Sequence, residues 1–103
     1  MINLKLVSAK MNLQNGLDQK CFEILNEVQK SLDSERKVPK QILSLFNEVW
    51  STYHWQREHY NRCHQSLLSF LVYSDLSSLS AIESKEVIYR LILSKKYSTL
   101  STN

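Results

Sequence analysis

Hydrophobic residues recur at steps of three and four positions through most of the chain, which is the spacing of one face of an α-helix. The clearest stripe spans residues 17–32, after Asn15, a residue type favoured at helix N-caps, and with Asp18 near the positive end of the helix dipole. We therefore expect an amphipathic helix here, with these residues facing inward: Leu17, Cys21, Ile24, Leu25, Val28 and Leu32.

A helix boundary is predicted at Val38-Pro39, because a residue before proline avoids the α region and proline suits the first turn of a helix. Two more helical stripes follow this boundary, over residues 42–53 and residues 60–71. We expect these residues to face inward: Ile42, Leu45, Phe46, Val49, Trp50 and Tyr53 in the first stripe, and Tyr60, Cys63, Leu67 and Phe70 or Leu71 in the second.

The two stripes together would make one helix roughly 50 Å long at 1.5 Å per residue, which is long for a small domain. Ser51 and Thr52 are residue types that cap helices, and Trp55 lies off the stripe extrapolated from its neighbours. We therefore predict a break near residues 51–54 that makes two antiparallel helices.

The last helix is predicted over residues 81–97, because Ser80 and Glu83 have the spacing of a capping box. Residues 1–11 are expected to form a short helix or a docked arm, and residues 98–103 a flexible tail. The inward residues of the last helix are expected to be Ile82, Val87, Ile88, Leu91 and Ile92.

The composition agrees with an all-α fold. The 103 residues include one glycine and one proline, too few for the tight turns of a β-protein. Hydrophobic residues make up 43% of the chain, which is a globular value. We predict a single domain over residues 1–103, built as a compact bundle of four to five antiparallel helices.

The stretch "YHWQREHYNRCHQSLL", residues 53–68, holds all three histidines and one of the two cysteines. His59 and Cys63 would share a helix face, but His64 is rotated about 100° from Cys63, and zinc needs three or four converging ligands. Cys63 also falls on an apolar stripe, where a thiol is a poor nucleophile. Cys21, from another helix, would be the one further candidate zinc ligand. We predict no metal, no cofactor and no enzymatic activity.

The net charge of +3 is mild, and acidic and basic residues are interspersed, so the chain lacks the basic stripe of a dedicated DNA-binding protein. Two cysteines are too few for a disulfide framework, and the first residues do not resemble a secretory signal. We expect an intracellular, cytoplasmic protein. Binding to nucleic acid would require six cations to meet on one face: Lys37, Lys40, Arg57, Arg62, Lys95 and Lys96.

A partner-binding surface is predicted at Trp55, His59 and Arg62. Tryptophan and arginine are enriched in the hot spots of protein interfaces. The alternative for Trp55 is that it covers the core at the junction of two helices.

The order of several short segments resembles a known helical domain. "KVP" precedes "ILSLFNEV", an aromatic "HW" leads to "HYNRCHQSLL", and the chain closes on "VIYRLILSKK". This order resembles the domain shared by the steroid receptor RNA activator protein and the C-terminus of the large outer-coat subunit of COPII vesicles. Residues 17–96 would carry the resemblance, although Glu86 stands where that family has glycine. The resemblance implies a helical interaction domain of a scaffold or coregulator.

The sequence thus predicts a non-enzymatic protein–protein interaction or scaffold domain that binds a macromolecular partner. A nucleic-acid-associated helical protein is one alternative. Another is a small helical bundle like the immunity proteins of bacteriocin producers, which share its size, helix content and charge. The oligomeric state and the identity of the partner stay open.

Overall fold

The computed structural model describes residues 2–100, and side chains throughout that range except those of Leu76 and Leu100. Within it the chain is all-α, as predicted, and none of its helices is long and apolar enough to cross a membrane. Of the expected tail, residues 98–100 belong to the last helix, and residues 101–103 lie outside the described range. The elements are α1 (Ile2–Gln14), α2 (Asp18–Ser34), α3 (Lys40–Gln56), α4 (Tyr60–Tyr73), the 3₁₀-helix η1 (Leu76–Ser78) and α5 (Ala81–Leu100).

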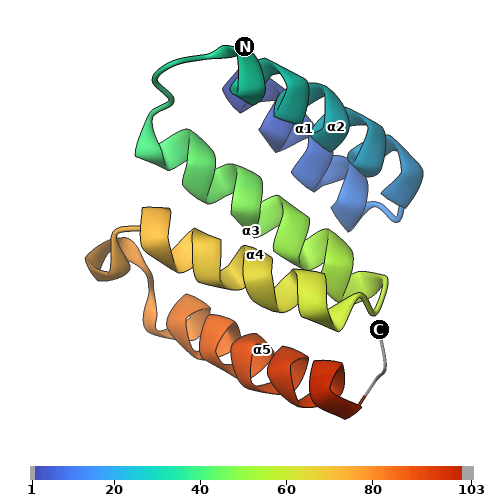
Figure 1. Cartoon of the computed structure of the whole chain (residues 1–103), viewed down its shortest axis with the longest axis vertical. Coiled ribbons are helices and arrows are strands. Elements are labelled where there is room, and N and C mark those ends of the chain that lie inside the picture. Colours follow the sequence, from blue (N-terminus) through green and yellow to red (C-terminus); the bar gives the residue numbers. More distant parts are fainter. Residues whose placement is uncertain (1, 101–103) are drawn as a thin grey trace.

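Successive helices run antiparallel and lie beside one another, with α1 and α2 at one end of the molecule and α5 at the other (Figure 1). Each helix contacts its neighbours in sequence, and α1 also contacts α3. The last helix contacts mainly α4. One side of α5 is therefore packed, whereas the other lies at the end of the molecule.

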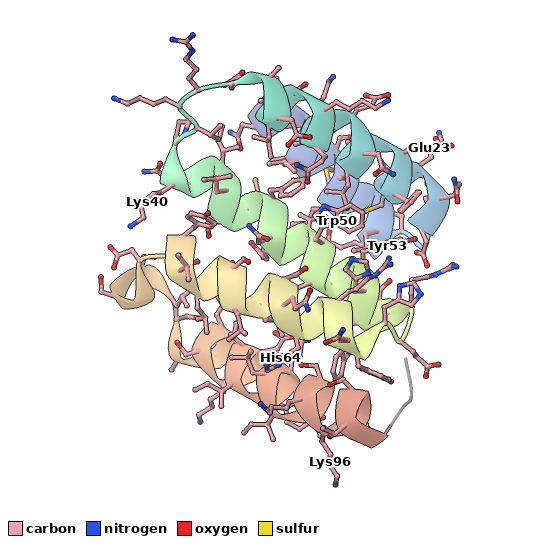
Figure 2. All side chains as sticks on the ribbon, in the orientation of Figure 1. Glu23, Lys40, Trp50, Tyr53, His64 and Lys96 are labelled. Carbon is pink, nitrogen blue, oxygen red and sulfur yellow. The ribbon has the colours of Figure 1, made fainter. Side chains whose placement is uncertain are left out.

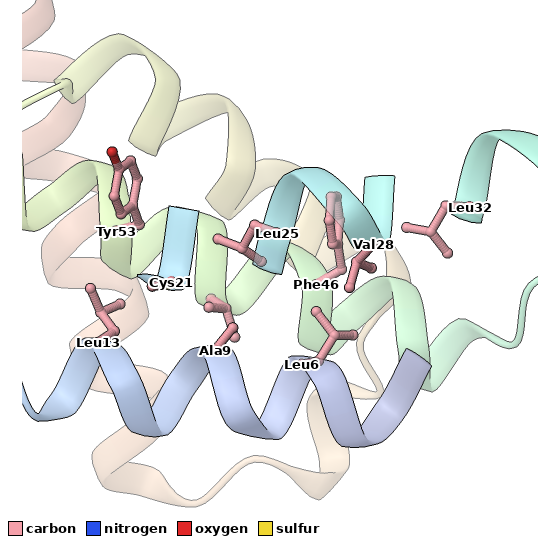
Figure 3. Packing of buried hydrophobic residues seen from close by; sticks show 10 residues of the cluster. Leu6, Ala9, Leu13, Cys21, Leu25, Val28, Leu32, Phe46 and Tyr53 are labelled. Carbon is pink, nitrogen blue, oxygen red and sulfur yellow. The ribbon is translucent and has the colours of Figure 1, made fainter. Parts of the chain in front are cut away.

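The main core lies between α1, α2 and α3 (Figure 3). Leu6 and Leu25 are fully buried there, and Phe46 of α3 is a buried member of the same cluster. Within the segment 1–11, expected as a docked arm or a short helix, residues 2–11 are thus part of a helix that belongs to the core. The buried members of the cluster are Leu6, Ala9, Leu13, Cys21, Leu25, Val28, Leu32, Phe46, Val49 and Tyr53.

The turn after α1 corrects the predicted N-cap. Gly16 has φ of +78°, and the Leu17 amide donates to the Asn12 carbonyl at 2.8 Å, which is the αL ending of a helix. Asn15 and Gly16 therefore end α1, whereas Leu17 is the N-cap of α2 and provides no side-chain cap.

The predicted break between the second and third stripes exists, but α3 continues to Gln56 before it ends. Glu58 has φ of 60°, and the His59 amide donates to the His54 carbonyl at 2.8 Å. This is the same αL ending as that of α1, with glutamate in the place usually taken by glycine. The break was predicted too early in the sequence because the left-handed conformation that ends α3 lies at Glu58, and glutamate is a residue type that seldom adopts it.

The inward face predicted for α5 was partly wrong. Ile82, Ile88 and Ile92 are 78%, 56% and 63% exposed, while Ser94 is completely buried against α4. The helix has apolar residues around most of its circumference, so periodicity alone could not select the packed side. The predicted cap is confirmed, since the Glu83 amide donates to Ser80 Oγ at 3.1 Å.

Candidate functional site

Trp55, the first of the three predicted partner-binding residues, packs toward α5. Its ring meets the ring of Tyr60 edge-on, with centroids 5.8 Å apart. The guanidinium carbon of Arg90 lies 5.5 Å from the Trp55 ring centroid, within cation–π range. Trp55 is half-buried and joins α3 to α4 and α5 through these contacts.

His59 and Arg62 have different neighbours from Trp55. His59 Nδ1 lies 3.3 Å from His54 Nδ1, and the side chains of both His59 and Arg62 are exposed. Arg62 lines a shallow hollow together with Trp50 and His54. The structure thus brings His59 and Arg62 close to His54, while Trp55 faces α5, and the shared surface of the three residues stays a prediction.

An aromatic cluster surrounds the buried His54. The rings of Trp50 and His54 stack with centroids 4.9 Å apart and planes 7° apart, and Phe22 of α2 contacts Trp50 and Tyr53. Burial, with smaller contributions from the nearby His59 and Arg62, lowers the pKa of His54 to about 4, so the imidazole is neutral at pH 7. These rings pack α3 against α2 (Figure 2 labels Trp50 and Tyr53).

Both cysteine side chains are completely buried. Burial raises the pKa of the Cys21 thiol and of the Cys63 thiol to about 11, so both are protonated at neutral pH. Neither thiol is presented as a nucleophile or as a metal ligand in this fold. Within residues 2–100 no three histidine, cysteine or acidic side chains lie close enough together to hold a metal ion.

A groove with a cavity of about 290 Å³ crosses α1, α3, α4 and α5. Apolar side chains, among them Leu67, Phe70 and Val87, line part of it, and polar side chains line the rest. Two ion pairs lie on its rim: Lys10 Nζ is 2.9 Å from Glu48 Oε1, and Arg90 Nη2 is 2.8 Å from Glu86 Oε1. We refer to this site as the four-helix groove. Sequence reasoning missed it because its residues come from four separate helices.

The six cations considered for nucleic-acid binding do not gather. Lys40 begins α3 and Arg57 follows its last residue, so they lie about 25 Å apart along the helix. Lys96 lies on α5, well away from Lys40 (Figure 2). This dispersal argues against a continuous basic surface of the kind that binds phosphates.

Residues 1–95 match the family model described as PSD13 N-terminal repeats. The chain is also 28% identical, over 94 residues, to the 26S proteasome non-ATPase regulatory subunit 13 homolog A of Arabidopsis thaliana. That match covers 91% of this chain and 24% of the relative, so the chain spans about a quarter of the relative's length. No solved structure gives a significant match.

The match corrects the resemblance drawn from short segments. The family is not the one shared by the steroid receptor RNA activator protein and the COPII coat subunit. Pairs such as His54-Trp55 and runs such as residues 87–92 are built from residue types that amphipathic helices commonly contain, which is why they misled. The coarser expectation of a helical domain agrees with the match and with the structure.

Proposed function

The chain belongs to the family of PSD13 N-terminal repeats, and from this premise we propose that it is a non-catalytic scaffold that binds neighbouring proteins in a proteasome regulatory assembly. The relative is described as a non-ATPase regulatory subunit of the 26S proteasome, which supports a role in assembly rather than in chemistry. This role would take place inside the cell.

The four-helix groove is the observation that carries the proposal. Stacked helical units use the surfaces shared by several helices to bind their partners. Here apolar side chains that line part of the groove lie beside the two ion pairs of Lys10 with Glu48 and Arg90 with Glu86. Such a groove suits a protein segment that inserts an apolar side chain and places polar groups against the charged rim.

A second contact is proposed at His59 and Arg62. Both side chains are exposed, and they lie at the edge of the aromatic cluster around Trp50 and His54. An arginine beside a partly buried tryptophan has the composition of an interface hot spot. Trp55 would support this contact indirectly, because it holds the α3–α4 junction against Arg90 of α5.

We expect bulky side chains at the mouth of the four-helix groove to prevent binding. Gln14 and Gln56 line the groove and are exposed, so Gln14→Trp with Gln56→Trp should obstruct it and leave the fold intact. Binding of the purified chain to purified 26S proteasomes can be measured by co-sedimentation. The double variant should bind at least tenfold more weakly, which corresponds to about 1.4 kcal/mol.

The matched control replaces two exposed glutamines outside the groove, Gln19→Trp with Gln41→Trp. This control should co-sediment as the unchanged chain does. Equal binding by the groove variant would show that the groove is not the contact surface. A failure of the unchanged chain to co-sediment would contradict the proposed function itself.

A further inference from the structure

The outer side of α5 carries a stripe with the spacing of a coiled-coil seam. Ile82, Lys85, Tyr89, Ile92 and Lys96 follow one another at steps of three, four, three and four residues. Ile82, Tyr89 and Ile92 are 78%, 61% and 63% exposed, and both lysines are exposed as well. We refer to these five residues as the α5 seam.

The α5 seam lies away from α4. Ser94 is completely buried and Leu91 half-buried on the opposite side of the helix, where His64 Nδ1 lies 3.2 Å from Ser94 Oγ. A helix that is apolar on two opposite sides is normally covered on both. The side that faces α4 is covered within the chain, so the seam is the side that remains for a partner.

The two lysines define the chemistry of that partner. Lys85 and Lys96 stand within the stripe, and neither forms an ion pair among residues 2–100. A helix that covers the seam must bring carboxylates opposite them, because a buried charge without a partner is strongly unfavourable. A second copy of the chain would add two more lysines and no carboxylate at the seam.

We propose that the α5 seam binds an amphipathic helix of a partner protein that carries carboxylates opposite Lys85 and Lys96. This inference deepens the proposed function, since it names the chemistry of one neighbour of the scaffold. The seam is distinct from the four-helix groove, which involves Glu83, Val87 and Arg90 of the same helix. The two surfaces would allow two proteins to contact α5 together.

The test uses two synthetic helical peptides of about three heptads with leucine at the seam positions. One peptide has glutamates in place of the two leucines that would face Lys85 and Lys96, and the other has lysines there. Fluorescence anisotropy measures the binding of each peptide to the full chain. The acidic peptide should bind at least tenfold more tightly than the basic one. The double variant Lys85→Glu with Lys96→Glu should reverse that preference.

A matched control, Lys20→Glu with Lys30→Glu on α2, makes the same change in net charge at exposed positions and should keep the preference for the acidic peptide. Equal binding of the peptides, or no saturable binding by the unchanged chain, would overturn the inference. So would dimerisation of the chain alone through the seam, detected by sedimentation equilibrium and abolished by the seam variant. A chain that still co-sediments with proteasomes would then leave the proposed function standing.

Discussion

Replacing Leu25 by alanine should lower the free energy of unfolding by about 2–5 kcal/mol. Leu25 is completely buried between α1 and α3, where it belongs to the cluster that contains Leu6 and Phe46. Truncation removes apolar contacts and leaves a cavity that tightly packed neighbours fill only in part. Urea unfolding followed by circular dichroism measures this loss, which is a large part of the stability of a small domain.

The control for this substitution is Leu68→Ala on α4. Leu68 is 47% exposed, so its truncation should change the free energy of unfolding by only about 0.5 kcal/mol. If both variants unfold at the same urea concentration as the unchanged chain, the packing of α1 and α2 described above is incorrect. If Leu68→Ala is the more damaging change, the register of α4 is incorrect.

Acidification should destabilise the fold through His54. Its pKa is about 4 in the folded chain, against about 6.5 for an ordinary histidine, because the ring is buried beside Trp50. Between these values the unfolded chain binds a proton that the folded chain does not, so stability falls as the pH drops through this range. The loss should approach roughly 3 kcal/mol near pH 4.

The variant His54→Phe isolates this effect. It keeps an aromatic ring against Trp50 but cannot titrate, so its stability should fall less steeply between pH 6.5 and pH 4. Carboxylates that titrate in the same range are common to both proteins and cancel in the comparison. Parallel stability curves for the two proteins would show that His54 is not held neutral by the fold.

The best predicted part of the fold is α2. Its stripe from Cys21 to Leu32 became a buried face because the apolar residues occupy one side and polar residues the other, although Leu17, also expected to face inward, is 47% exposed. The first helix was harder to predict from the sequence, since the apolar Leu4 and Met11 are exposed on the side opposite the buried Leu6. Apolar residues on both sides weaken the helical period, so only the packing of α1 against α2 separates the two faces.

The turn that ends α3 and the packed side of α5 could not be predicted from the spacing of apolar residues. Glu58 adopts the left-handed conformation that ends α3, and glutamate at that position has no distinctive pattern. The outer side of α5 is as apolar as its inner side, so the choice between them depends on the small Ser94 that lets α5 approach α4. The turn depends on one local backbone conformation and the packed side of α5 on its contacts with α4, and periodicity contains neither.

The candidate functional site also has one part that the sequence indicates and one part that only the fold brings together. The aromatic and histidine side chains of residues 53–68 gather at the junction of α3 and α4, and this concentration is visible in the sequence because the residues are contiguous. The four-helix groove joins residues as far apart as Lys10 and Arg90, so only the packed structure could reveal it. The separation of Trp55 from His59 likewise follows from the turn at Glu58.

Affinity capture of the tagged chain from cells, followed by quantitative mass spectrometry, tests whether the chain is a scaffold in a proteasome regulatory assembly. Proteasome regulatory subunits should be enriched with the unchanged chain and with the Gln19→Trp, Gln41→Trp control. Their enrichment should be lost with the variant in which Gln14 and Gln56, at the mouth of the four-helix groove, are tryptophan. If enrichment is absent with the unchanged chain, the proposed scaffold role is contradicted. If enrichment is equal for all three proteins, the four-helix groove is not the contact surface.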